Sequence, residues 1–221
     1  MHVGKLMARL NPKNVRFDVG SGGIPELTST DIAAALAFVD RGLGRELLCK
    51  VWWPDGAALT ERQLFDFLET IQRDEWSRRE SAMLDGLLAV ATRGSRGQGS
   101  YAAAHENRWP RMVLVEHGLP VLADAYGRVR KAVVAEVCST GLCPKCAGRG
   151  LVCNSMGVHS ACSTCEGSGH HRISERERGE ACGMAWKTYR ETWVRVYDWT
   201  FQQCMDAVHQ ATRQFEAAVG G

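Results

Sequence analysis

The sequence predicts a mainly α-helical protein with a small cysteine-rich module inserted near residue 143. Apolar residues recur at helical spacing in several segments, and no segment shows the run of strict alternation that is typical of strands. Two cysteine motifs of one design lie in the C-terminal half. They are followed by a stretch that favours two short helices around a glycine.

Composition and length limit the class of protein. The 221 residues are 45% hydrophobic and 24% charged, which suits one large domain or two smaller ones. No apolar run is long enough to span a membrane, and residues 1–10 lack the features of a signal peptide. Nine cysteines is an odd number, which favours a reducing compartment over a disulfide framework. Because the net charge is only +2, any contact with nucleic acid must be local.

Caps and glycines organise the first sixty residues. Residues 1–27 contain the run Gly20-Ser-Gly-Gly23 and are expected to form a flexible arm. Thr28-Ser-Thr-Asp31 offers caps for a helix over residues 32–39, which Gly42 and Gly44 are expected to stop.

A second set of helix signals follows. Thr60-Glu-Arg-Gln63 has the form of a capping box and opens a helix, and another helical stretch leads up to Arg93. The basic, glycine-rich segment 93–100 predicts a loop. Helical spacing resumes over residues 112–137, with an interruption near Gly118-Leu-Pro120.

The middle of the chain carries excess positive charge. Between residues 93 and 131 three acids, Glu106, Glu116 and Asp124, stand against seven basic residues: Arg93, Arg96, Arg108, Arg111, Arg128, Arg130 and Lys131. On charge alone, a solvated helix face explains this segment better than a binding patch.

The two cysteine motifs predict a metal site. They read Cys143-Pro-Lys-Cys146-Ala-Gly-Arg-Gly and Cys162-Ser-Thr-Cys165-Glu-Gly-Ser-Gly. Two thiolates on a tight turn can face one Zn²⁺, two such turns complete a tetrahedral four-sulfur site, and the glycines permit the φ > 0 turns required. The spacing of fifteen residues lies at the lower edge of the expected range. The sequence therefore predicts one structural zinc ion, with no open position for catalysis, held by Cys143, Cys146, Cys162 and Cys165.

Other interpretations of the cysteines stay open. Cys138 or Cys153 could replace a ligand, and so could one histidine among His159, His170 and His171. A thioredoxin-like redox pair is disfavoured because the motif is duplicated with the same glycine tail. The remaining cysteines are expected to be small core residues: Cys49, Cys182 and Cys204. The chain shows no paired carboxylates, Gly-x-Ser-x-Gly motif or phosphate loop, so we predict that it is not an enzyme.

The segment after the cysteine motifs predicts a helix-turn-helix. Ser174 and Glu177 have the spacing of a capping box. Gly179 is small where two helices would cross, Gly183 supplies the turn, and Tyr189 is expected to pack the second helix on the first.

The second of these helices would present three side chains at its start. Trp186, Lys187 and Arg190 could approach base edges and phosphates in a DNA major groove. A plain helical hairpin with a glycine turn explains the pattern equally well. The tail beyond keeps helical rhythm and is expected to be core, through Trp193, Val196, Tyr197, Phe201, Cys204, Met205, Val208 and Phe215.

The order of these features resembles a known family. Paired knuckles alone are similar to the cysteine-rich region of Hsp40-type co-chaperones, but those have four repeats and a J-domain signature that this chain lacks. A helix, two knuckles, a helix-turn-helix-like stretch and a closing helix resemble, over the C-terminal two-fifths, the antitermination protein Q of lambda-type bacteriophages. The Trp193…Tyr197-Asp198…Gln203-Cys204 spacing supports the resemblance, as does Ala123-Asp-Ala-Tyr126.

The resemblance implies a mechanism without enzymatic activity. Such proteins bind double-stranded DNA at a phage late promoter, engage paused bacterial RNA polymerase through its core and sigma factor, and let it read through terminators. Carried over, residues 172–193 would read DNA, with groove contacts from Trp186, Lys187, Thr188 and Arg190 and phosphate contacts from Arg172 and Arg195. No membrane or small-molecule substrate is expected, and the host cytoplasm would be the location.

Four regions follow from this interpretation: an arm over residues 1–27, a helical region over 28–137 that could contact polymerase, a zinc module over 138–171, and the DNA-binding region with its closing helix over 172–221. Two rivals stay open, another zinc-dependent DNA-binding regulator and a chaperone-like module that binds unfolded polypeptide. A thiol oxidoreductase is the least favoured alternative.

Overall fold

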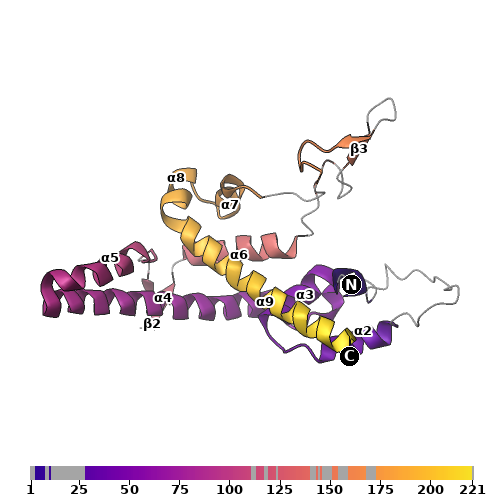
Figure 1. Cartoon of the computed structure of the whole chain (residues 1–221), viewed down its shortest axis with the longest axis horizontal. Helices are drawn as coiled ribbons and strands as arrows, with labels where there is room; N and C mark the ends of the chain where they lie inside the picture. The colour runs from indigo at the N-terminus through magenta and orange to yellow at the C-terminus, as the bar shows by residue number, and fades with distance from the viewer. Residues whose placement is uncertain are drawn as a thin grey trace. The chain divides into compact units, whose positions relative to one another are not determined.

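The computed structural model is mainly helical, as the sequence predicts (Figure 1). It describes residues 3–7, 10, 28–110, 113–116, 119–122, 124–139, 143, 145, 151–153, 159–167 and 173–220. The chain divides into two compact units, which are described separately. The first comprises residues 1–60, 134–174 and 202–221, and the second comprises residues 61–133 and 175–201.

The first unit contains the N-terminal helices. Within the expected arm the structure describes the short helix α1 (Val3–Met7), whose Val3, Leu6 and Met7 are buried. Helix α2 (Ser29–Ala37) begins earlier than the predicted start at residue 32, after a capping box in which the Asp31 amide donates to Thr28 Oγ1 (3.2 Å) and the Thr28 amide to Asp31 Oδ2 (2.8 Å). These bonds hold the pKa of Asp31 below its usual value.

Helix α3 (Leu43–Trp52) corrects one expectation, because Gly44 lies inside this helix and does not stop a preceding one. A Cβ at Gly44 would lie 2.0 Å from the carbonyl oxygen of Ala207, so the glycine permits close contact with the C-terminal helix α9 (Val194–Gly220). The short 3₁₀ helix η3 (Pro54–Gly56) follows. The core of the unit combines α1, α2 and α3 with Ala211 and Phe215 of α9.

The second unit is built on one long helix, α4 (Glu61–Arg93), which begins directly after Thr60. The two helical stretches predicted over residues 60–93 are thus a single helix. The predicted loop after it is a 3₁₀ turn, η4 (Gly94–Gly97), that leads into α5 (Gln98–Glu106), and α5 packs back along α4 (Figure 1).

A β-hairpin replaces the helix expected to begin at residue 112. Strands β1 (Val113–Glu116) and β2 (Leu119–Leu122) pair antiparallel, with Val113 opposite Leu122. The physical reason is local, since two short runs rich in valine and leucine flank a glycine, which is a hairpin signal. Helix α6 (Asp124–Cys138) follows.

Aromatic rings form much of the core of the second unit. Trp109 lies edge-on to Trp199, with ring centroids 5.1 Å apart, and Tyr126 lies edge-on to Trp193 at 4.9 Å. The Tyr126 hydroxyl donates to the carbonyl oxygen of Pro110 (2.9 Å). As predicted, the apolar stripe of the closing helix is core: Trp193, Val196 and Tyr197 are buried in this unit, and Cys204 and Phe215 are buried in the first.

Part of the excess positive charge noted in the sequence is internal. Arg130 is largely buried and contacts Glu69 (2.8 Å) and Gln72 Oε1 (3.0 Å), while the Gln72 amide donates to Thr200 (2.8 Å). Arg108 pairs with Glu80 (2.8 Å). These side chains neutralise acids inside the fold, so the basic segment does not form one continuous patch. Among the described residues no helix is long and apolar enough to cross a membrane.

Candidate metal centre and nucleic-acid interface

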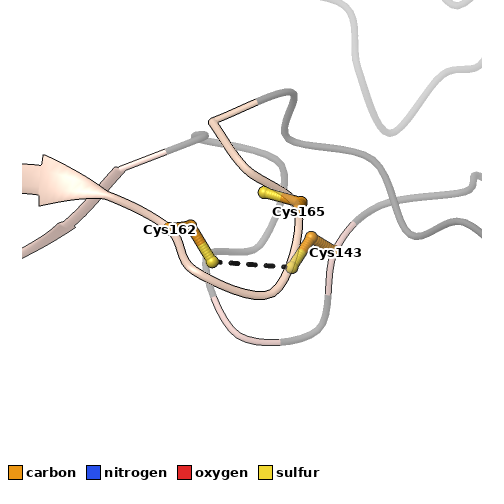
Figure 2. A group of neighbouring side chains, drawn as sticks. All are labelled: Cys143, Cys162 and Cys165. Carbon is orange, nitrogen blue, oxygen red and sulfur yellow. Dashed lines mark hydrogen bonds between the residues drawn. The ribbon is translucent and has the colours of Figure 1, made fainter.

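Three of the four predicted metal ligands lie together. The Sγ atoms of Cys143, Cys162 and Cys165 lie within 4.8 Å of one another, and all three residues are buried (Figure 2). Cys146 lies outside the described residues, so the fourth position of a tetrahedral site stays a prediction. Cys162 and Cys165 come from a turn directly after the hairpin of β3 (Leu151–Cys153) and β4 (His159–Ala161).

The spacing of the sulfurs fits a metal ion better than a disulfide. The Sγ atoms of Cys143 and Cys162 are 3.8 Å apart, the contact drawn as a dashed line in Figure 2. Tetrahedral Zn²⁺ with Zn–S bonds of about 2.3 Å places its sulfurs about 3.8 Å apart, whereas a disulfide needs about 2.05 Å. The three cysteines could therefore bind a metal ion with little rearrangement.

A left-handed turn ends the second cysteine motif. Glu166 and Gly167 have φ of 51° and 85°, so the chain turns back as expected for the glycine tail, and the Gly167 amide donates to the carbonyl oxygen of Cys162 (3.3 Å). Lys145 ties the two motifs together, since its Nζ donates to Ser163 Oγ (2.9 Å).

The environment of Cys162 favours its thiolate. Burial by itself would raise the pKa of this thiol, but hydrogen bonds from the amides of Thr164 and Cys165, and from the thiols of Cys165 and Cys143, lower the pKa to about 6. Thiolates are the form that a metal ion binds.

The other cysteines differ in kind. Cys49, Cys182 and Cys204 are fully buried, as predicted for core residues, and burial raises the pKa of their thiols to about 11, 11 and 12. Cys138 is half-buried at the end of α6, and burial raises its pKa as well. Cys153 lies in β3 with its backbone opposite His159. His170 and His171 lie outside the described residues.

The region predicted as a helix-turn-helix consists of two helices around a tight turn. Helix α7 (Glu175–Ala181) begins directly after Ser174, and α8 (Trp186–Thr188) continues through a π-helical turn, η5 (Tyr189–Trp193), into α9. A π-helical turn inside a helix is uncommon and is found frequently at functional sites.

Gly183 ends α7 in a Schellman motif. Its φ of 63° is left-handed, its amide donates to the carbonyl oxygen of Glu180 (2.9 Å), and the Met184 amide reaches back to Gly179 (3.0 Å). This arrangement supplies the turn that the sequence predicts at Gly183.

Tyr189 packs on Gly179 as predicted. The tyrosine is fully buried, and a Cβ at Gly179 would lie 3.1 Å from its Cγ atom. Tyr189 also stacks on Trp186 (6.4 Å between centroids) and meets Tyr197 edge-on (5.9 Å). The contact fixes where the start of α8 lies relative to α7.

The predicted DNA-contacting side chains are exposed where the structure describes them. Trp186 is 41% exposed, and Lys187, Thr188 and Arg190 are exposed as well. Arg195 is exposed but donates to the carbonyl oxygen of Glu106 within the unit. Arg172 lies outside the described residues. Four exposed acids share this region: Glu175, Glu177, Glu180 and Glu191.

Sequence reasoning missed the role of Arg128. Its Nε donates to the carbonyl oxygen of Cys182 (3.0 Å), in the turn itself, and its guanidinium also pairs with Asp124. Arg128 therefore braces the turn from helix α6. The sequence offers no signal for this contact, because 54 residues separate its two partners.

No protein-family model matches the chain, and no curated protein or solved structure is similar to it at a significant level.

Proposed function

We propose that this protein is a bacteriophage transcription antitermination factor that contains one structural zinc ion. It binds a specific double-stranded DNA site at a late promoter, engages paused bacterial RNA polymerase through core and sigma factor, and lets the enzyme read through terminators. The order of the two cysteine motifs, α7, α8 and the closing helix supports this proposal, because it resembles the order of these features in antitermination protein Q.

One observation carries the DNA-binding part of the proposal. The start of α8 exposes Trp186, Lys187 and Arg190, while Tyr189 between them is buried against Gly179. An aromatic ring, an ammonium and a guanidinium on a helix that is held in place suit contacts with base edges and phosphates.

Zinc has a supporting role in the proposal. Three buried thiols, of which Cys143 and Cys162 have the sulfur spacing of a tetrahedral zinc site, support a closed, structural site in this proposal. Cys146 would complete the ligand set. Zinc binding would stabilise the cysteine module, because the binding energy of such a site is folding energy.

The charge around α7 and α8 suggests how the factor is recruited to DNA. Between residues 175 and 195 five basic residues, Arg176, Arg178, Lys187, Arg190 and Arg195, face four glutamates, so the net field toward phosphates is weak. Affinity for DNA alone should be modest. A partner that is already bound to the DNA, such as a paused polymerase, would supply the remaining binding free energy.

Selection of duplexes from a random library on the wild-type protein, followed by fluorescence anisotropy, tests this proposal. We expect Lys187→Ala with Arg190→Ala to weaken binding to the selected duplex at least about tenfold, because both side chains are proposed to contact base edges in the groove. Arg213→Ala, an exposed arginine of α9 outside this region, is the matched control and should change little. Failure to enrich any sequence, or equal binding by all three proteins, would contradict the proposal.

A further inference from the structure

Helix α4 exposes an apolar face near its C-terminal end. Leu84, Leu87 and Leu88 are 65%, 47% and 63% exposed, and Ala91 completes the i, i+3, i+4, i+7 pattern. The same side of the helix is polar in its earlier turns, with exposed Arg62, Asp66, Thr70, Arg73 and Ser77. Single exposed leucines are ordinary, but a contiguous apolar face of this kind marks an interaction site. We call these four residues the leucine face.

The helix that carries the leucine face is firmly supported from its other side. A Cβ at Gly86 would lie 2.9 Å from Cα of Tyr101, and one at Gly97 would lie 2.2 Å from the carbonyl oxygen of Ala89. Helices α4 and α5 therefore approach backbone to backbone, and they run side by side in Figure 1. Because α5 occupies the side of α4 that contains Gly86 and Ala89, it leaves the leucine face uncovered.

Positive charge borders the leucine face. Arg93 and Arg96 are exposed at the turn that follows, and neither makes an ion pair with any residue that the structure describes. Asp85 is the single acid between residues 84 and 97. A complementary surface would thus be apolar in its centre and acidic at one edge.

We propose that the leucine face, with Arg93 and Arg96, docks an apolar and acidic segment of a protein partner. A second copy of the chain fits less well, because its leucine face offers only Asp85 to these two arginines. Nucleic acid fits less well because leucines make no contact with phosphates. The inference rests on the proposed function, which makes RNA polymerase holoenzyme the partner to test.

The test measures binding of the full chain to bacterial RNA polymerase holoenzyme by biolayer interferometry. Leu84→Ala with Leu88→Ala is expected to weaken binding at least about tenfold. Phe67→Ala is the control, because Phe67 is an exposed apolar residue of the same helix (43%) outside the leucine face. Alanine is a strong helix former, so the circular dichroism of the leucine variant should match that of the wild type.

Reversing the charge of the two arginines gives the binding experiment a second test. Arg93→Glu with Arg96→Glu is expected to weaken binding at least about tenfold, and the loss should shrink as salt is raised. Arg62→Glu, at an exposed site near the start of α4, should leave binding unchanged.

Several results would overturn the inference. Equal binding by the wild type and the leucine variant would overturn it alone. A wild-type dimer in analytical ultracentrifugation that the leucine variant abolishes would also overturn it. Wild-type binding to anionic vesicles that the leucine variant abolishes would do the same. Wild-type protein that does not bind polymerase at all would instead contradict the proposed function, and this inference with it.

Discussion

Replacing Cys143 by serine is expected to release the metal ion and to unfold the cysteine module. The Cys143 sulfur is fully buried and lies 3.8 Å from that of Cys162, so a hydroxyl there cannot supply the thiolate that the site needs. Structural zinc sites bind with about 10–16 kcal/mol shared among four ligands, so one lost ligand should weaken zinc binding about 100- to 1,000-fold. A competition titration with a chromophoric chelator measures this change, and proteolysis reports the unfolding.

Serine substitutions at the other cysteines distinguish metal ligands from core residues. Cys49→Ser is the matched control, because Cys49 is equally buried but belongs to the helical core of the first unit, and it should keep its zinc. Cys146→Ser should behave as Cys143→Ser does. If Cys146→Ser retains full zinc affinity while Cys138→Ser or Cys153→Ser loses it, the predicted fourth ligand is wrong.

Replacing Tyr189 by alanine is expected to destabilise the second unit by about 3–5 kcal/mol, the range for deleting a large buried aromatic side chain. The ring fills the space beside Gly179 and contacts the rings of Trp186 and Tyr197. Urea unfolding followed by tryptophan fluorescence reports the loss, because five of the seven tryptophans belong to this unit. DNA binding should fall as well, since α8 would no longer be held against α7.

Tyr189→Phe is the control for this experiment. The Tyr189 hydroxyl is buried without a hydrogen-bond partner among the described residues, so its removal leaves no new unsatisfied group. Stability should stay the same or rise slightly. A Tyr189→Phe variant as unstable as Tyr189→Ala would show that the hydroxyl, and not the packed ring, supports the unit.

Local patterns in the sequence predicted those parts of the fold that depend on neighbouring residues. Thr28 and Asp31 form their capping box, Gly183 has the left-handed φ of the turn, and Tyr189 packs on Gly179. In each case the interaction spans at most ten residues, so spacing alone determines it. The same holds for Cys162 and Cys165, which are brought together by one turn.

Contacts between distant segments could not be predicted. Gly44 was expected to end a helix, but its role is to let α3 approach the backbone of Ala207, which no local pattern shows. Arg130 belongs to a segment predicted as a solvated helix face, but its guanidinium contacts Glu69 and Gln72 inside the fold. The β1–β2 hairpin was missed for another reason, since runs of four residues are too short to separate strand from helix by periodicity.

The most direct test of the account is transcription past a terminator in vitro. The template carries the selected DNA site across a bacterial promoter, with an intrinsic terminator downstream, and purified host polymerase holoenzyme is used. We predict that the wild-type protein raises read-through severalfold, and that neither Cys143→Ser nor Lys187→Ala with Arg190→Ala does so. Wild-type protein that binds the template but leaves termination unchanged would contradict antitermination and favour another zinc-dependent transcription regulator.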